Sequence, residues 1–166
     1  MTTPENERDV VLRREIPFAR ALVWKAITDP AHMQQWWGPD GFTIENLTMD
    51  LRVGGTWIFD MVGPDGTRYP NHSVFTEIVP PARLVYDHGD GQRIWFIASI
   101  LLDETATGTM VTIRQVFPDP RVARRGRDEA RRHRGWEAAS GEDGGVRAGA
   151  LGLVWPSLSS GRFRGF

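Results

Sequence analysis

Cysteine is absent from this chain of 166 residues, which excludes disulfide bonds, thiolate metal sites and a cysteine nucleophile. Long apolar runs are absent as well. No segment approaches the roughly 18 apolar residues that a membrane-spanning helix needs, and the first ten residues are too polar for a signal peptide. We therefore expect a cytoplasmic protein with no membrane partner.

The short motifs that serve nucleotide and ester chemistry are also missing. The sequence has no GxGxxG pattern, no phosphate-binding GxxxxGK loop and no GxSxG elbow. Its four histidines, His32, His72, His88 and His133, do not have the HxxxH or HExxH spacing of a local metal site, so a metal would need ligands from separate elements. We expect neither a metal nor a cofactor.

A balanced net charge of −1 hides an uneven distribution along the chain. Residues 1–118 hold ten basic and fifteen acidic residues, whereas residues 119–166 hold ten basic and six acidic residues and half of the 18 glycines. The arginines of the second segment have no aromatic residues between them and are diluted by Asp128 and Glu129, so we expect a solvated basic segment and no nucleic-acid partner.

The first segment has the pattern of an α+β domain. Residues 8–16 alternate in polarity and predict a strand. Two short helices follow, the first ending at Asp29-Pro30 and the second at Gly38-Pro39. After Gly41 the chain consists of alternating strand patterns separated by turn residues. These further strands are expected at residues 42–52, 56–61, 67–79, 82–88, 92–103 and 109–117.

The predicted strands form a meander, which favours a curved antiparallel sheet of about six to seven strands with an apolar concave face. Within residues 42–52 the apolar side chains change parity near Glu45-Asn46, as a β-bulge would cause. Trp57, Phe59 and Met61 alternate in period two and share one side of their strand. Such an apolar face must be covered by other elements of the protein or occupied by a ligand.

Five motifs of this segment occur in an order and spacing that can be compared with known families. They are Trp36-Trp37-Gly38-Pro39, residues 50–55 followed by Trp57, Gly63-Pro64-Asp65-Gly66, Tyr69-Pro70-Asn71 and residues 77–86. Together they resemble the family of bacterial homologues of the activator of heat shock protein 90 ATPase, which belongs to the START-like (SRPBCC) helix-grip superfamily. The resemblance covers residues 8–118. It implies a sheet that grips a long C-terminal helix, with an apolar cavity between them.

The chain departs from this family after residue 118, where the resemblance implies an amphipathic helix. The helical stripe that begins at Val122 meets polar residues such as Glu129 and His133, and the glycines that follow cost about 1 kcal/mol each inside a helix. We therefore divide the chain into a START-like domain, residues 8–118, and an atypical segment, residues 119–166, which we expect to pack poorly. Two explanations stay open: a frameshift in a GC-rich gene, or a genuinely divergent tail.

Six large side chains are the candidate lining of an apolar pocket: Trp37, Trp57, Phe59, Met61, Phe75 and Trp95. Ligand sites are mostly apolar with few polar groups, but the same side chains would also fill an ordinary core. Five titratable residues on predicted strands are candidates for acid–base chemistry if they face the cavity: Asp60, Arg68, Glu77, Tyr86 and His88. Surface strand residues would give the same pattern.

Three function classes follow from these observations. The first is a protein that binds a small hydrophobic or aromatic molecule between the sheet and the helices. The second is a cyclase or hydratase on the same scaffold. The third is a module that contacts a chaperone and activates its ATPase, as the family name suggests. Residues 94–102 are apolar on both parities, so we also expect a homodimer.

Overall fold

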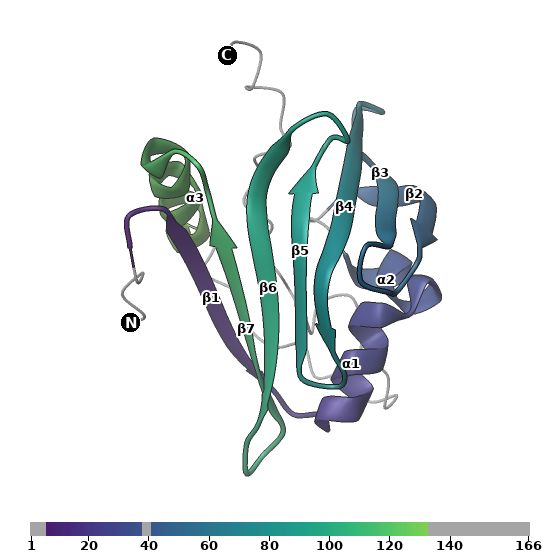
Figure 1. Cartoon of the computed structure of the whole chain (residues 1–166), viewed down its shortest axis with the longest axis vertical. Coiled ribbons are helices and arrows are strands. Elements are labelled where there is room, and N and C mark those ends of the chain that lie inside the picture. Colours follow the sequence, from purple (N-terminus) through teal and green to yellow (C-terminus); the bar gives the residue numbers. More distant parts are fainter. Residues whose placement is uncertain (1–5, 38–40, 133–166) are drawn as a thin grey trace.

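A computed structural model of the chain describes residues 6–37 and 41–132. Within these residues, seven antiparallel strands form one sheet in the order β1-β7-β6-β5-β4-β3-β2, with three short helices around it (Figure 1). The predicted α+β class is confirmed. The elements are β1 (Asp9–Ile16), α1 (Arg20–Thr28), α2 (Pro30–Trp36), β2 (Thr43–Met49), β3 (Thr56–Val62), β4 (Arg68–Val79), β5 (Arg83–Gly89), β6 (Ile94–Glu104), β7 (Thr109–Val116) and α3 (Pro120–Arg132).

The two predicted helices near the N-terminus are separated by a single residue, Asp29. Its backbone is extended, which ends α1, and its carboxylate accepts a hydrogen bond of 2.9 Å from the backbone N–H of Ala31, which caps α2. Pro30 stands at the first position of α2, where a missing N–H does no harm. Helix α2 packs against β2 at that edge of the sheet, and α1 contacts β6 (Figure 1).

The predicted β-bulge is present in β2. The pairing of β2 with β3 shifts between Glu45 and Thr48, and Asn46 adopts a positive φ of 54°. Asparagine tolerates this left-handed conformation better than most residues. Its side-chain nitrogen also donates a hydrogen bond of 2.8 Å to the Asp60 carboxylate on β3. The bulge therefore lets both Ile44 and the later residues of β2 pack against the core.

Most of the buried side chains of the sheet lie on one surface, which we call the inner face; the opposite surface is the outer face. The inner face carries Trp57, Phe59 and Met61 of β3, and α1 adds Val23 and Ile27 to the same core. Alternation along each strand directs these residues to one side. This burial of large apolar side chains is the main stabilising contribution to the fold.

Strand β6 is apolar on both parities, but only one parity is buried. Phe96, Ala98, Ile100 and Leu102 are at most 2% exposed, whereas Ile97 is 47% exposed on the outer face. Ile94 has the same parity as these buried residues but is 54% exposed. The cause is a register shift between β5 and β6 at His88 and Gly89, which turns the start of β6 away from the core.

The N-terminal strand β1 forms one edge of the sheet, where it pairs with the last strand, β7. Asp9 of β1 is fully buried, and its carboxylate forms an ion pair with Arg114 of β7, with distances of 2.8 Å to Nη2 and 3.0 Å to Nε. The ion pair joins the two strands at the edge of the sheet that lies beside α3 (Figure 1).

A helix follows β7, so the expectation that the chain packs poorly from Asp119 onward is wrong for α3. The Asp119 carboxylate caps this helix by accepting a hydrogen bond of 2.8 Å from the backbone N–H of Arg121. Ala123 is fully buried and Gly126 is buried, because small residues let the helix approach β1 closely. Arg127 donates hydrogen bonds of 2.8 and 2.7 Å to the carbonyls of Glu7 and Asp9.

The packing of α3 depends on small residues and one arginine, which a search for an apolar stripe does not detect. The division of the chain at residue 118 and the frameshift hypothesis stay predictions. Residues 133–166, on which most of the tail prediction falls, lie outside the described residues. Among the described helices, none has the length and apolar character that crossing a membrane requires.

Candidate functional site

The centre of the candidate site is Trp57, in the middle of an aromatic cluster on the inner face. Its ring centroid lies 4.8 Å from that of Trp37 and 5.2 Å from that of Phe59. Tyr86 approaches edge-on at 5.5 Å, and Phe75 lies parallel at 6.5 Å. Offset and edge-on contacts of this kind are the favoured geometries of aromatic pairs.

Five of the six predicted lining residues therefore come together, because Met61 is also fully buried beside this cluster. The sixth, Trp95, is partly buried and lies elsewhere, with its ring centroid 5.6 Å from that of His88. The structure gives the five residues a core-packing role. Their contact with a ligand stays a prediction.

Polar side chains interrupt the apolar inner face where β4 and β5 meet. Ser73 and His88 face each other across the two strands, both fully buried, with Ser73 Oγ 2.8 Å from His88 Nδ1. Asn71 lies two residues along β4 on the same face and is 1% exposed. A buried polar group without a partner costs stability, so this cluster is the chemically distinctive part of the face.

His88 is uncharged at neutral pH because of its surroundings. Its ring stacks on Phe96 at 4.8 Å and meets Trp95 edge-on. Burial in this apolar environment lowers the pKa of His88 to about 3, and the nearby His72 contributes in the same direction. The imidazole therefore acts as a neutral hydrogen-bonding group.

Tyr86 lies on the same strand as His88 and is also on the inner face, 1% exposed. Its burial raises the pKa of its hydroxyl above the ordinary value, because the phenolate would be desolvated. Of the five titratable candidates, Tyr86 and His88 are the two that lie on the inner face. Both are held in their neutral forms.

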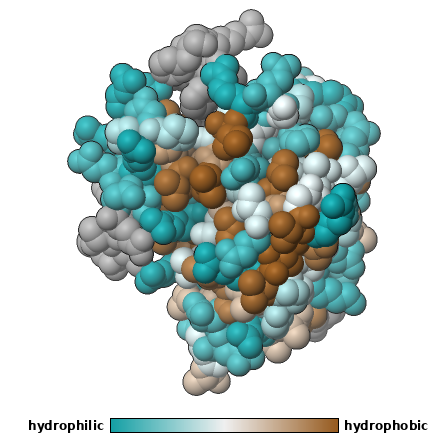
Figure 2. Space-filling view, in the orientation of Figure 1, coloured by the Kyte–Doolittle hydropathy of each residue, from teal (hydrophilic) through white to brown (hydrophobic). Residues whose placement is uncertain are grey.

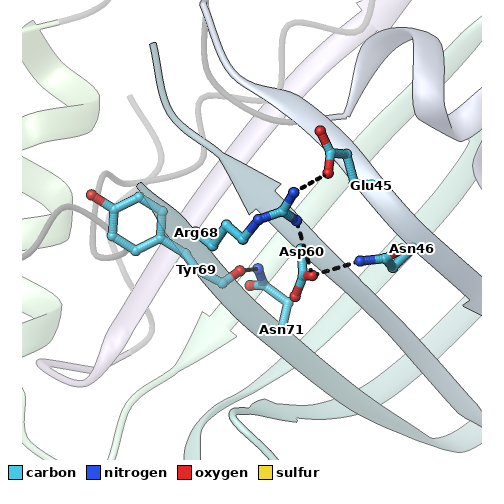
Figure 3. A network of polar contacts seen from close by, with 6 residues as sticks. All are labelled: Glu45, Asn46, Asp60, Arg68, Tyr69 and Asn71. Atoms are coloured by element: carbon cyan, nitrogen blue, oxygen red, sulfur yellow. Dashed lines mark hydrogen bonds and ion pairs between the residues drawn. The ribbon is translucent and has the colours of Figure 1, made fainter. Parts of the chain in front are cut away.

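The other three candidates lie on the outer face, so they do not meet the condition of facing the cavity that acid–base chemistry there would require. Arg68 forms ion pairs with Glu45 and, at 3.4 Å, with Asp60 (Figure 3). Glu77 pairs with Arg83 at 3.3 Å. The physical reason is strand alternation, because Asp60 follows the inward Phe59 by one residue.

Three buried polar atoms of the inner face have no hydrogen-bond partner within the described part of the chain: Trp57 Nε1, Asn71 Oδ1 and Gln115 Oε1. The sequence analysis did not single out Asn71, Ser73 or Gln115. A signal was present, because Asn71 and Ser73 share the period-two register of the inward Phe75. A search for polar residues at the inward positions of an otherwise apolar strand would have identified them.

Within residues 6–37 and 41–132, no three histidine, aspartate or glutamate side chains come close enough together to hold a metal ion. The polar groups of the inner face are instead amides, a hydroxyl and a neutral imidazole, which suit hydrogen bonding to an organic molecule.

The family model of the Activator of Hsp90 ATPase homolog 1-like proteins matches residues 17–142. The chain belongs to this family. None of the curated proteins matches the chain.

Solved structures share the fold of this family member. A protein of Nitrosomonas europaea is 26% identical with a TM-score of 0.71, and the match covers 78% of this chain and 87% of the other. A protein of Arthrobacter aurescens is 28% identical with a TM-score of 0.64 and coverages of 76% and 80%. An AHSA1-like protein of Aeromonas hydrophila, 22% identical with a TM-score of 0.61 and coverages of 71% and 83%, is similar in fold.

Proposed function

We propose that the protein binds a small hydrophobic or aromatic molecule against the inner face of its sheet. The observation that carries this proposal is the combination of the Trp57 aromatic cluster with two buried polar atoms, Trp57 Nε1 and Asn71 Oδ1, that have no hydrogen-bond partner among the described residues. Ligand sites typically combine an apolar wall with a few polar groups that fix orientation. The family fold is consistent with such binding.

An enzyme of the cyclase or hydratase type is the second candidate, because Ser73 and His88 form a buried hydrogen-bonded pair. A general base works best when its pKa is near the working pH. His88, with its pKa lowered to about 3, is a weak base at neutral pH. The pair is therefore better suited to orienting a ligand than to removing a proton, and binding is the preferred function.

A contact with a chaperone is the third candidate and rests on the family description. Large exposed apolar patches commonly mark sites of contact with a protein partner. Figure 2 shows such surface across the middle of the outer face, surrounded by hydrophilic side chains. Exposed Ile58 and Ile97 belong to the outer face, together with half-buried Val85 and Leu101. We assign this surface to a second copy of the chain.

Ligand binding is tested by titrating toluene and decanol while tryptophan fluorescence is followed. We expect a saturable change that the Trp57→Phe variant largely loses, because this indole is the ring at the centre of the cluster. The Trp24→Phe variant, which changes a partly buried tryptophan of α1, is the matched control and should keep the response. A folded wild-type protein without any saturable response would contradict the proposal.

A further inference from the structure

The orientation of the Asn71 side chain is fixed by a backbone carbonyl. Its amide nitrogen donates a hydrogen bond of 2.7 Å to the carbonyl oxygen of Tyr69 (Figure 3). Because a carbonyl only accepts hydrogen bonds, the amide cannot be turned round without losing this contact. The other atom, Asn71 Oδ1, is therefore a fixed acceptor, buried and without a partner in the described part of the chain.

Trp57 supplies the complementary group on the neighbouring strand. Its Nε1 is a hydrogen-bond donor that is buried and has no partner among the described residues. In the pairing of β3 with β4, Trp57 lies opposite Ser73 and Phe59 lies opposite Asn71. Trp57 and Asn71 are thus diagonal neighbours on the inner face, a relation in which Cα atoms lie about 7–8 Å apart and aromatic side chains can reach across.

Charged molecules are poor ligands for this part of the inner face. Among the described residues, the buried polar side chains include no lysine and no arginine, and the one buried carboxylate, Asp9, is paired with Arg114 at the β1 edge. His88 is neutral, as shown above. A carboxylate ligand would be desolvated without a counter-charge and would meet the oxygen of Asn71, and an ammonium group would meet the N–H of Trp57.

We propose that the ligand of the inner face is uncharged and carries a hydroxyl group that Asn71 Oδ1 and Trp57 Nε1 hold between them. A hydroxyl both donates and accepts, so it satisfies the two atoms at once. The aromatic or aliphatic body of the ligand then lies against Trp57 and its neighbouring rings. This inference rests on the proposed function and adds the chemical class of its ligand.

The test compares three molecules of the same ring skeleton: naphthalene, 2-naphthol and 2-naphthoate. Calorimetric titration of the full chain at neutral pH should show 2-naphthol binding about tenfold more tightly than naphthalene, the effect of one or two hydrogen bonds in a buried site. The binding of 2-naphthoate should be weaker than that of 2-naphthol by at least the same factor.

Two variants locate the polar contact. Asn71→Leu should lower the affinity for 2-naphthol to that for naphthalene, while naphthalene binding stays within about threefold. His72→Leu, one residue along β4 on the outer face, should leave the preference unchanged. If Asn71→Leu does not fold, the relative affinities of the three ligands for the wild-type chain still test the proposal.

The outcomes separate the two proposals. Equal binding of naphthalene and 2-naphthol, or tighter binding of 2-naphthoate, would overturn the hydroxyl assignment and leave apolar binding in place. An Asn71→Leu variant that folds and keeps the full preference for 2-naphthol would also overturn it. Failure of all three molecules to bind would contradict the proposed function, and the inference would fall with it.

Discussion

His88 is a residue whose chemistry depends on its neighbours. In isolation a histidine titrates near neutrality, but burial beside Phe96 and the nearby His72 lower the pKa of this ring and keep it neutral. The sequence showed a histidine on a strand and no more. The pairing with Ser73, 15 residues earlier, depends on the register of β4 with β5, and register is not readable from either strand alone.

The lowered pKa of His88 predicts that acid destabilises the protein. An unfolded histidine takes up a proton below about pH 6.5, whereas the folded one resists until about pH 3. Stability is therefore present above pH 6.5 and is lost as the pH falls through this window. We expect His88 to account for a loss of about 2 kcal/mol in unfolding free energy between pH 7 and pH 5.

Urea denaturation at a series of pH values measures this contribution. The His88→Gln variant keeps an amide that can hydrogen-bond to Ser73 but does not titrate, so its stability should decline less over the same range. The carboxylates with lowered pKa values, such as Glu15 and Asp29, titrate in both proteins and cancel in the comparison. Parallel pH profiles for the two proteins would show that His88 is not responsible.

Among the elements, the sheet was predictable and α3 was not. Alternating apolar residues indicated Trp57, Phe59 and Met61 as one face, and the parity change at Asn46 indicated the bulge, because both patterns are local. The helix α3 is held by contacts that no local pattern contains. Arg127 reaches the carbonyls of Glu7 and Asp9, about 120 residues away along the chain.

We expect Arg127→Met to lower the unfolding free energy by about 1–2 kcal/mol, because two charged hydrogen bonds to backbone carbonyls are lost. Arg124→Met changes an exposed arginine of the same helix and should stay within about 0.5 kcal/mol of the wild type. Thermal unfolding of both variants provides the comparison. Equal stabilities would mean that the Arg127 contacts do not hold α3 against β1.

At the scale of the whole molecule, the outer face exposes apolar side chains such as Ile58 and Ile97 among the described residues. Two copies related by a two-fold axis would cover Ile97 and the neighbouring Val116 of both chains. The predicted homodimer should appear in light scattering as twice the chain mass. Ile97→Arg should give monomers, while Val53→Arg, in the exposed turn after β2, should remain dimeric. A wild-type monomer at all accessible concentrations would reject the dimer.

The position of β1 in the sheet also affects how the protein is made. Strands β2 to β7 follow one another as hairpins, so each can pair with its predecessor soon after leaving the ribosome. β1 has no such neighbour, because its partner is β7, and the ion pair between Asp9 and Arg114 joins residues 105 positions apart. Until translation has passed β7, Asp9 and the apolar side chains of β1 remain in water, exposed to chaperones and to aggregation. The first strand to be synthesised is the last to pair.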